Sequence, residues 1–366
     1  MTRSPEMGPP INPEGIAERI LKKASKFGFD SAGWTKASPP LDFVFFSQWL
    51  SDGMHGEMNY LDKHRDARSD PNSILPGVKT ILMVSMNYKP ETNITEINGF
   101  SGKIARYARG PDYHEMLWRK LDKFGQELAE MLPELSWRGI TDSAPLLERG
   151  YAKRCGLGWI GKNTLLINRQ IGSFTVLGGL LLNTELPPNP FQNETPDSCG
   201  SCTRCLDACP TQALLPERKL DARQCISYWT IEKKGELGKE NGSRLNGWLF
   251  GCDICQEVCP WNRKSKSGSL LGQKADLATL DCTEVLKMSD DQLRASIRGT
   301  ALKRTKTNGL RRNALWILGS SGTMETLSLI ESFIHSEDRG ISQAALWAKE
   351  QIKGRSTTLP KIPTNQ

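Results

Sequence analysis

The chain has 366 residues, with 48 Lys and Arg against 41 Asp and Glu, and 38% of its residues are hydrophobic. This length predicts two or three domains, and this composition excludes a wholly disordered chain. No apolar run reaches the roughly 18 residues that a transmembrane helix needs, and residues 1–10 contain neither an apolar core nor a twin arginine. We therefore expect a cytoplasmic protein with no export signal and no membrane contact.

Residues 16–183 have a mixed α/β pattern. Apolar residues at helical spacing predict helices, and short apolar runs predict buried strands. We expect helices at 16–27, 117–131 and 145–154, and strands at 31–34, 80–86, 164–168 and 174–182. The first predicted domain spans residues 1–185.

A segment rich in Pro and Asn, residues 186–196, predicts a linker into a second domain, residues 186–268. The third predicted domain, residues 269–366, has a helical pattern. Within it Ala314-Leu315-Trp316 recurs 31 residues later as Ala345-Leu346-Trp347, which predicts a pair of HEAT-like units. Two helices of a small bundle would produce the same pattern, so both arrangements stay open.

Eight of the ten cysteines lie between Cys199 and Cys259. In a reducing compartment such crowding indicates metal ligands rather than disulfides. The first four form C-x2-C-x2-C-x3-C-P, the run that holds two iron–sulfur clusters in bacterial ferredoxins. A second run repeats its last three cysteines, and Cys225 is the obvious replacement for the missing first one.

The fourth cysteine of such a run binds the other cluster. Pseudo-symmetry therefore predicts two [4Fe–4S] clusters, one held by Cys199, Cys202, Cys205 and Cys259 and the other by Cys209, Cys225, Cys252 and Cys255. A pair of zinc sites is the alternative, but zinc favours paired C-x2-C knuckles and does not need the C-x3-C-P element. Cys155 and Cys282 stand apart, and a buried structural thiol is the default for each.

Residues 156–163, GLGWIGKN, fit G-x-G-x-x-G and nearly fit a phosphate-binding loop. Both nucleotide motifs need a strand before the loop and a helix after it. The predicted order here is reversed, which disfavours a nucleotide site. The glycines instead allow a close approach of the backbone to something flat or bulky.

Four features together resemble the epoxyqueuosine reductase family. They are the cysteine pattern, the glycine loop, the segment Asp142-Ser-Ala-Pro-Leu-Leu-Glu-Arg149 and the segment Arg106-Tyr-Ala-Arg-Gly-Pro-Asp-Tyr-His114. The resemblance covers about residues 16–351. It implies a multidomain α/β + α protein with an N-terminal corrinoid-binding α/β domain, a ferredoxin-like two-cluster domain and a C-terminal α-helical HEAT-like domain.

The resemblance also implies a reaction, the reduction of epoxyqueuosine to queuosine at the wobble position of tRNA. The implied cofactors are cobalamin and two [4Fe–4S] clusters, and an external low-potential donor supplies the electrons. Cob(I)alamin would attack the epoxide while Asp142 protonates the oxygen. We expect burial to raise the pKa of Asp142 for this task. Without the resemblance, an Asp in Thr-Asp-Ser-Ala-Pro is a turn or cap residue.

Family matching places six residues at cobalamin, namely Arg68, Ala105, Asp142, Leu166, Leu177 and Ser227. Plain core packing is the alternative for the two leucines. The corrinoid signature D-x-H-x-x-G, which supplies a His to cobalt, is not met, because Leu117 stands where Gly is required. We therefore expect no His ligand to cobalt, and His114 either faces substrate or is a buried, hydrogen-bonded histidine.

tRNA contacts are expected from a stretch of the tail, residues 298–312, that carries no acidic residue. Lys and Arg side chains of such a stretch can bind phosphates, although a solvated surface is the alternative. The expected contacts are Lys233, Lys234, Arg298, Lys303, Arg304, Arg311 and Arg312. The family also favours a monomer.

Two other functions compete with this interpretation. A corrinoid iron–sulfur reductive dehalogenase would share the cofactors, but such proteins usually carry a twin-arginine signal and lack a basic helical tail. A ferredoxin-type electron carrier would leave the whole N-terminal domain unexplained.

Overall fold

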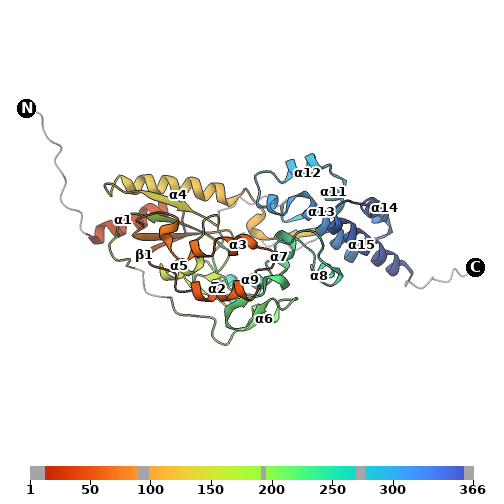
Figure 1. The fold of residues 1–366 in the computed structure, drawn as a ribbon, viewed down its shortest axis with the longest axis horizontal. Coiled ribbons are helices and arrows are strands. Elements are labelled where there is room, and N and C mark those ends of the chain that lie inside the picture. The colour runs from red at the N-terminus through yellow and green to blue at the C-terminus, as the bar shows by residue number, and fades with distance from the viewer. Residues whose placement is uncertain (1–12, 90–98, 191–194, 269–276, 358–366) are drawn as a thin grey trace, which may run out of the picture.

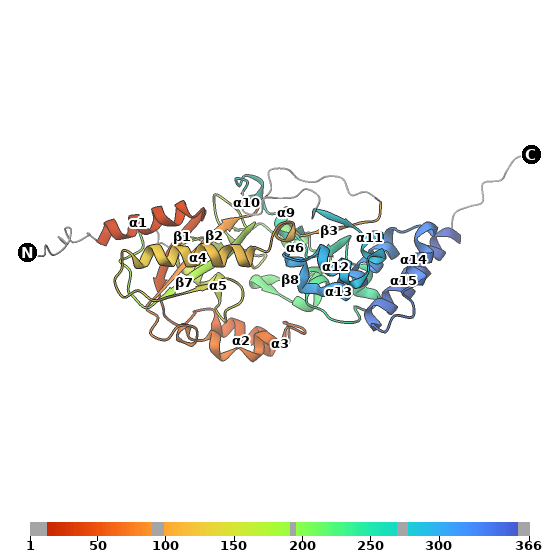
Figure 2. The same ribbon diagram turned by 90° about the horizontal axis from the view of Figure 1, so that it is seen from above.

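A computed structural model describes residues 13–89, 99–190, 195–268 and 277–357 of the chain (Figure 1). The segment on which the export-signal prediction depends, part of the predicted linker and the start of the predicted helical domain lie outside these ranges. Figures 1 and 2 show an elongated molecule, with α1 at one end, α15 at the other, and α6 and α9 between them.

The first half of the chain alternates helices and strands. Its helices are α1 (Pro13–Lys26), α2 (Phe43–Ser51), α3 (Asn59–Lys63), α4 (Tyr113–Ala129) and α5 (Glu148–Arg154). Its strands are β1 (Ser31–Lys36), β2 (Thr80–Asn87), β3 (Ser101–Ile104), β4 (Trp137–Ile140), β5 (Trp159–Ile160), β6 (Leu166–Ile167) and β7 (Thr175–Leu182).

Every helix and strand predicted for this half is present. Helix α5 begins three residues later than the sequence predicts. The reason is a turn that follows Thr141, in which the Leu146 N–H donates to the Ala144 carbonyl at 2.8 Å. The mixed α/β character of this half is therefore confirmed.

The second half consists mainly of short helices. They are α6 (Arg204–Asp207), α7 (Ile226–Ile231), α8 (Lys239–Ser243), α9 (Ile254–Glu257), α10 (Pro260–Arg263), α11 (Cys282–Lys287), α12 (Asp290–Ser296), α13 (Lys306–Ser321), α14 (Leu327–Glu331) and α15 (Arg339–Thr357). The strands are β8 (Leu214–Leu215), β9 (Lys219–Leu220), β10 (Trp248–Phe250) and β11 (Thr279–Asp281).

The main sheet has the strand order β1-β2-β7-β4, and each neighbouring pair is antiparallel. All eight residues of the central strand β2 are buried. Leu82 and Val84 pack with residues of α1 and α4 on one face, whereas Ile81 and Met83 pack with α5 on the other. Because helices cover both faces, neither side of the strand needs to be polar, and this explains the apolar run at residues 81–84.

Strand β3 connects parts of the chain that the sequence assigns to three domains. It pairs in parallel with β10 and antiparallel with β11. One hydrophobic core extends from Ile104 through Trp229 and Phe250 to Trp316 and Ile352. The boundaries at residues 185 and 268 stay a prediction, but β3 packs with the second half of the chain and not with the main sheet.

At the C-terminal end, α13 and α15 lie side by side, and the repeated tryptophans meet there (Figure 1). The ring centroids of Trp316 and Trp347 are 4.5 Å apart. A Cβ at Gly319 would lie 2.2 Å from the Trp347 ring, so glycine permits this close packing. The repeat therefore joins two helices, as both a HEAT-like pair and a small bundle require. No described helix has both the length and the apolar character that crossing a bilayer demands.

Candidate functional site

The eight crowded cysteines gather where α6 and α9 contact each other, and all are free thiols. Most of their electrostatic interactions fall within two groups of four. The Cys205 thiol interacts with those of Cys259, Cys199 and Cys202, and we call these four the 199 quartet. The Cys252 thiol interacts with those of Cys225 and Cys209, and with Cys255 they form the 209 quartet. The two quartets have the same members as the two predicted ligand sets.

The donor chemistry of each quartet fits an iron–sulfur cluster, because cysteine thiolates are the ligands that hold such clusters. The Ala213 N–H also lies 3.3 Å from Cys209 Sγ, where it stabilises negative charge on sulfur. Within the described residues, no three His, Cys, Asp or Glu side chains are grouped so as to hold a single metal ion. A cluster of several irons spaces its thiolates more widely than one ion does, so this finding does not conflict with the assignment.

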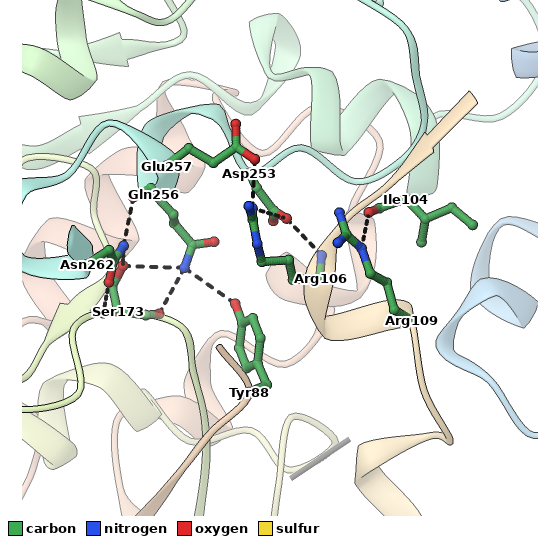
Figure 3. Close-up of polar contacts among 9 residues, drawn as sticks. All are labelled: Tyr88, Ile104, Arg106, Arg109, Ser173, Asp253, Gln256, Glu257 and Asn262. Atoms are coloured by element: carbon green, nitrogen blue, oxygen red, sulfur yellow. Dashed lines mark hydrogen bonds and ion pairs between the residues drawn. The ribbon is translucent and has the colours of Figure 1, made fainter. Parts of the chain in front are cut away.

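A buried polar network fastens α9 to the first half of the chain (Figure 3). The Arg106 backbone N–H donates to Asp253 Oδ2 at 2.7 Å, and its guanidinium donates to the same oxygen at 3.2 Å and to Glu257 Oε1 at 2.7 Å. On the other side of α9, Gln256 Nε2 donates to the Ser173 carbonyl at 2.8 Å. Because Asp253, Gln256 and Glu257 flank Cys255 in the sequence, Arg106 fixes the cysteine-bearing helix to the segment that leads into α4.

Asp142 lies in the loop between β4 and α5 with a left-handed backbone φ of 54°. A non-glycine residue keeps this conformation only when its neighbours hold it. The Asp142 N–H donates to Glu148 Oε1 at 2.7 Å, and the Tyr113 hydroxyl donates to Asp142 Oδ2 at 2.5 Å. His114 Nε2 lies 3.6 Å from the same oxygen. The Asp142 side chain is still 62% exposed, so the carboxylate is held in place yet accessible to an incoming molecule.

The two carboxyl groups of this loop differ in pKa. Partial desolvation by the surrounding protein acts to raise the pKa of Asp142, but the His114 ring and the Tyr113 hydroxyl outweigh it, and the pKa falls below its usual range. Burial and the neighbouring Asp142 charge raise the pKa of Glu148 to about 8. The expectation of a raised pKa is therefore wrong for Asp142 in its described surroundings, because the sequence does not reveal which donors face a carboxylate.

Three residues hold Asp142, and the sequence did not predict this role for any of them. They are Tyr113, His114 and Glu148. All three lie in the two motifs that carry the family resemblance. The two motifs therefore contained the residues that hold Asp142. Only the fold, however, brings residues 113–114 close to residues 142–148.

The predicted corrinoid contacts come from both halves of the chain. Arg68 interacts electrostatically with Glu148, and the Leu177 carbonyl accepts from the Thr141 hydroxyl at 3.0 Å, next to Asp142. Leu166 is buried in a core with Ile140, as the packing alternative predicts.

Ala105 directly follows β3, which pairs with the second half of the chain, and Ser227 lies in α7. The Ala105 N–H donates to the Phe250 carbonyl at 2.9 Å, and the Ser227 carbonyl accepts from the Thr230 hydroxyl at 3.2 Å. The Tyr107 ring lies 6.1 Å from both the Phe250 and the Tyr113 rings and so links the two sides. Of these residues, Leu177 has a printed bond next to Asp142, and Tyr107 connects the ring that donates to Asp142 with Phe250, to which Ala105 donates.

Four of the predicted tRNA residues are exposed, namely Lys234, Arg298, Lys303 and Arg304. Lys303 Nζ is paired with Asp112 Oδ2 at 2.7 Å. Arg304 pairs with Glu232 at 3.0 Å, and its guanidinium lies 5.3 Å from the centre of the Tyr60 ring. Lys233 is partly exposed and forms an ion pair with Glu57.

Arg311 and Arg312 are corrections to that prediction. Arg312 is 2% exposed and donates to the carbonyls of Lys233, Gly235 and Trp229 at 2.7–2.9 Å. Arg311 is largely buried, pairs with Asp290 and donates to the Met288 carbonyl at 2.8 Å. Both guanidinium groups hold the protein together and are not available to phosphates.

The glycine loop lies between α5 and β6, in the order that disfavours a nucleotide site. The glycines of this loop leave space for neighbouring residues of the same chain rather than for a ligand. A Cβ at Gly158 would lie 2.2 Å from the Ile167 carbonyl oxygen, and one at Gly161 would lie 2.4 Å from the Ile167 side chain. The close approach that the sequence predicts is therefore within the β5–β6 hairpin.

Comparison with known families matches two parts of the chain. Residues 68–143, which include Asp142, match the family described as epoxyqueuosine reductase QueG, DUF1730. Residues 198–262, which include all eight quartet cysteines, match the 4Fe-4S double cluster binding domain. An epoxyqueuosine reductase of Cyclobacterium marinum is 41% identical over 303 residues, covering 80% of this chain and 94% of that protein.

Solved structures of the same family are also similar to this chain. A Bacillus subtilis epoxyqueuosine reductase, with its catalytic aspartate loop swung out of the active site, is 28% identical with a TM-score of 0.83, covering 93% of this chain and 91% of that one. Another epoxyqueuosine reductase structure, with an epoxyqueuosine-modified tRNA-Tyr stem loop, is 26% identical with a TM-score of 0.83 and the same coverage. Together with the cysteine quartets, these similarities show that the chain belongs to the epoxyqueuosine reductase family of oxidoreductases.

Proposed function

We propose that this protein reduces epoxyqueuosine in tRNA to queuosine, with Asp142 as the proton donor. The observation that carries the proposal is the Asp142 loop. An accessible carboxylate is held in a left-handed conformation by Glu148 and Tyr113, in a chain whose family includes a structure with epoxyqueuosine-modified tRNA. A general acid needs this combination of fixed position and access to substrate. Neither a dehalogenase nor a simple electron carrier is favoured by a specific observation.

We also propose that each quartet holds one [4Fe–4S] cluster and that electrons enter at the 199 quartet. Gly200, Ser201 and Arg204, between the cysteines of that quartet, are exposed. The 209 quartet lies toward Asp142, because Tyr107 interacts electrostatically with both Asp142 and Asp253, and Asp253 follows Cys252. The thiols of Cys205 and Cys255 interact across the two quartets, which supports electron transfer between the clusters. An external low-potential donor completes the route.

The proposed second cofactor is cobalamin, with Arg68, Ala105, Asp142, Leu166, Leu177 and Ser227 as its contacts. Bound cobalamin supplies a reduced cobalt that is a strong nucleophile toward an epoxide carbon. The chain's own residues position the substrate oxygen and control its protonation. The Tyr113 hydroxyl and the Asp142 N–H hold the acid in place, and the hydrocarbon side chains around Leu177 exclude water.

For tRNA, we propose phosphate contacts by Lys233, Lys234, Arg298, Lys303 and Arg304. Arg304 and the Tyr60 ring lie together, and Tyr60 interacts electrostatically with Asp142. A basic group on an aromatic face next to the acid suits a nucleobase that enters the site. The three-domain layout, the HEAT-like character of α13–α15, the monomeric state and the cytoplasmic location stay predictions.

The decisive experiment compares wild-type protein with Asp142→Asn. Both are reconstituted with iron, sulfide and cobalamin and assayed on a tRNA stem loop that carries epoxyqueuosine. Asparagine keeps the acceptor for Tyr113 but carries no acidic proton, so we expect turnover to fall by about 10²–10⁴-fold. Asp122→Asn on the exposed face of α4 is the matched control and should keep wild-type turnover. A reconstituted wild-type protein that leaves the epoxide intact would refute the proposed function.

A further inference from the structure

The chemistry of the proposed function requires more protons than Asp142 can hold. Conversion of an epoxide to an alkene breaks both C–O bonds, forms one C=C bond and releases the oxygen as water. Two electrons from the external donor and two protons balance the step, and both protons end on the same oxygen. A single carboxyl delivers one proton at a time, so Asp142 must be reloaded between the two transfers, and a neighbouring side chain that holds a proton can do this directly.

His114 lies in the position that such a group requires. Asp112 caps the start of α4 and accepts from the His114 backbone N–H at 3.1 Å. The same Asp112 oxygen lies 2.7 Å from His114 Nδ1, so this nitrogen carries a proton. The opposite nitrogen, Nε2, is thereby turned toward Asp142 Oδ2 at 3.6 Å. The Tyr113 ring, stacked on His114 at 4.1 Å between centroids, fixes the plane of the imidazole.

The charges around the ring favour the imidazolium. Burial opposes a charge on His114, but the carboxylates of Asp142 and Asp112 outweigh it and raise the His114 pKa above its ordinary value. Asp112 is itself 5% exposed and is kept ionised by Lys303 on its other oxygen. Glu148 and Arg149 interact electrostatically with Asp142, whereas the groups that raise the His114 pKa are Asp142 and Asp112.

We propose that His114 is a positioning residue that reloads Asp142 with protons during epoxide reduction. The Nε2–H bond breaks and an O–H bond forms on Asp142 Oδ2, leaving a neutral imidazole with its Nδ1–H on Asp112. Asp142 then passes the proton to the leaving oxygen. The transfer becomes favourable as negative charge develops on that oxygen, and water returns a proton to His114 afterwards. This proposal rests on the proposed function and gives His114 the role that the sequence left open.

The first test needs no cofactor and no substrate. The chain has only four histidines, so an NMR pH titration of the imidazole signals is tractable, and His114→Gln identifies the His114 signal by its loss. We expect the wild-type His114 pKa to lie above 6.5 and to fall in both Asp142→Asn and Asp112→Asn. A His114 pKa that is the same in wild type and in Asp142→Asn would overturn the proposal.

The second test separates proton supply from folding. We expect His114→Gln to lower kcat on the epoxyqueuosine stem loop by about 10-fold or more, to remove the imidazole limb from the pH profile, and to leave KM unchanged. His335→Gln, a histidine in the C-terminal segment far along the chain from Asp142, should behave as wild type. An unchanged pH profile in His114→Gln would overturn the reloading role. Absence of turnover in wild type would instead refute the proposed function while the NMR result still stands.

Discussion

The backbone N–H of Asp142 donates to Glu148 Oε1 at 2.7 Å, six residues further along the chain. The loop that presents the proposed acid is thus held by a second carboxyl. Burial and the Asp142 charge raise the pKa of that second carboxyl to about 8. The conformation of the Asp142 loop therefore depends on a group that titrates near neutral pH.

The first prediction concerns stability against pH in Glu148→Gln. A carboxyl whose pKa is raised on folding destabilises the folded state as the pH rises from its ordinary value of 4.5 to about 8. Glutamine keeps the acceptor oxygen but cannot ionise. We expect the variant to gain stability over wild type across this window, on the order of 1–2 kcal/mol at the upper end after allowing for solvent contact. Thermal unfolding at a series of pH values measures this gain.

Glu148→Ala is the companion variant. It removes both the charge and the acceptor, so the Asp142 loop should lose its support. We expect Glu148→Ala to have a lower Tm than wild type at acid pH. At the same pH, Glu148→Gln should have the same Tm as wild type. A difference between Glu148→Gln and wild type that stays constant from about pH 5 to pH 8 would contradict the raised pKa.

The second prediction concerns the ion pair of Arg106 and Asp253, which are 9% and 2% exposed at their side chains. Removal of one partner leaves a buried charge, so Arg106→Met should lower the free energy of unfolding by about 3–5 kcal/mol. Lys239→Ala breaks an exposed pair with Glu350 and should lower it by about 0–1 kcal/mol. Denaturant titration compares the two variants, and equal losses would show that the network in Figure 3 contributes little.

The third prediction concerns iron content. Cys202→Ala and Cys252→Ala each remove one thiol, from the 199 quartet and the 209 quartet respectively. Each variant should retain about four of roughly eight irons after anaerobic reconstitution. Cys155→Ala is the matched control, because this buried thiol packs in the core with Ile81 and should not affect iron binding. Full iron content in either quartet variant would show that the removed thiol is not a ligand.

The fourth prediction concerns tRNA. We expect the triple variant Lys234→Ala, Arg298→Ala and Arg304→Ala to weaken stem-loop binding. The slope of log K against log salt should fall by about 0.7–0.9 for each phosphate that the variant no longer neutralises. Lys22→Ala, exposed on α1, should leave the slope unchanged. An unaltered salt slope in the triple variant would exclude this surface.

Arg312→Ala is the companion variant for that surface, because Arg312 belongs to the same basic run but is buried. It should destabilise the fold, since three carbonyls lose their donor. Thermal unfolding measures the effect, and a wild-type Tm in Arg312→Ala would contradict its structural role.

The sequence predicts the parts of the molecule that short local patterns determine. The spacing of the cysteines predicts both quartets, since C-x2-C-x2-C-x3-C-P wraps one group and turns the last thiol away. The burial of β2 follows from the apolar run at residues 81–84 in the strand. The repeated Ala-Leu-Trp predicts two related helices, and Trp316 packs on Trp347 where α13 and α15 meet.

Long-range contacts account for what the sequence could not predict. Arg312 belongs to a basic run, yet its guanidinium is buried against the carbonyls of residues 229–235, far away in the chain. The pKa of Asp142 falls because His114 and Tyr113 fold next to it, whereas burial alone would raise it. The pairing of β3 with β10 and β11 joins segments that each look like part of a different domain.

The attachment of α9 through Arg106 has a consequence for transplanting the electron-transfer unit. In a fragment that contains only residues 195–268, β10 would lack its partner strand β3. Asp253 would lack Arg106 and become an unpaired buried anion. Such a fragment would not behave as a detachable ferredoxin, and a foreign ferredoxin grafted in its place would lack the matching arginine. Any redesign must therefore exchange the cysteine-bearing helices and the segment that carries Arg106 together.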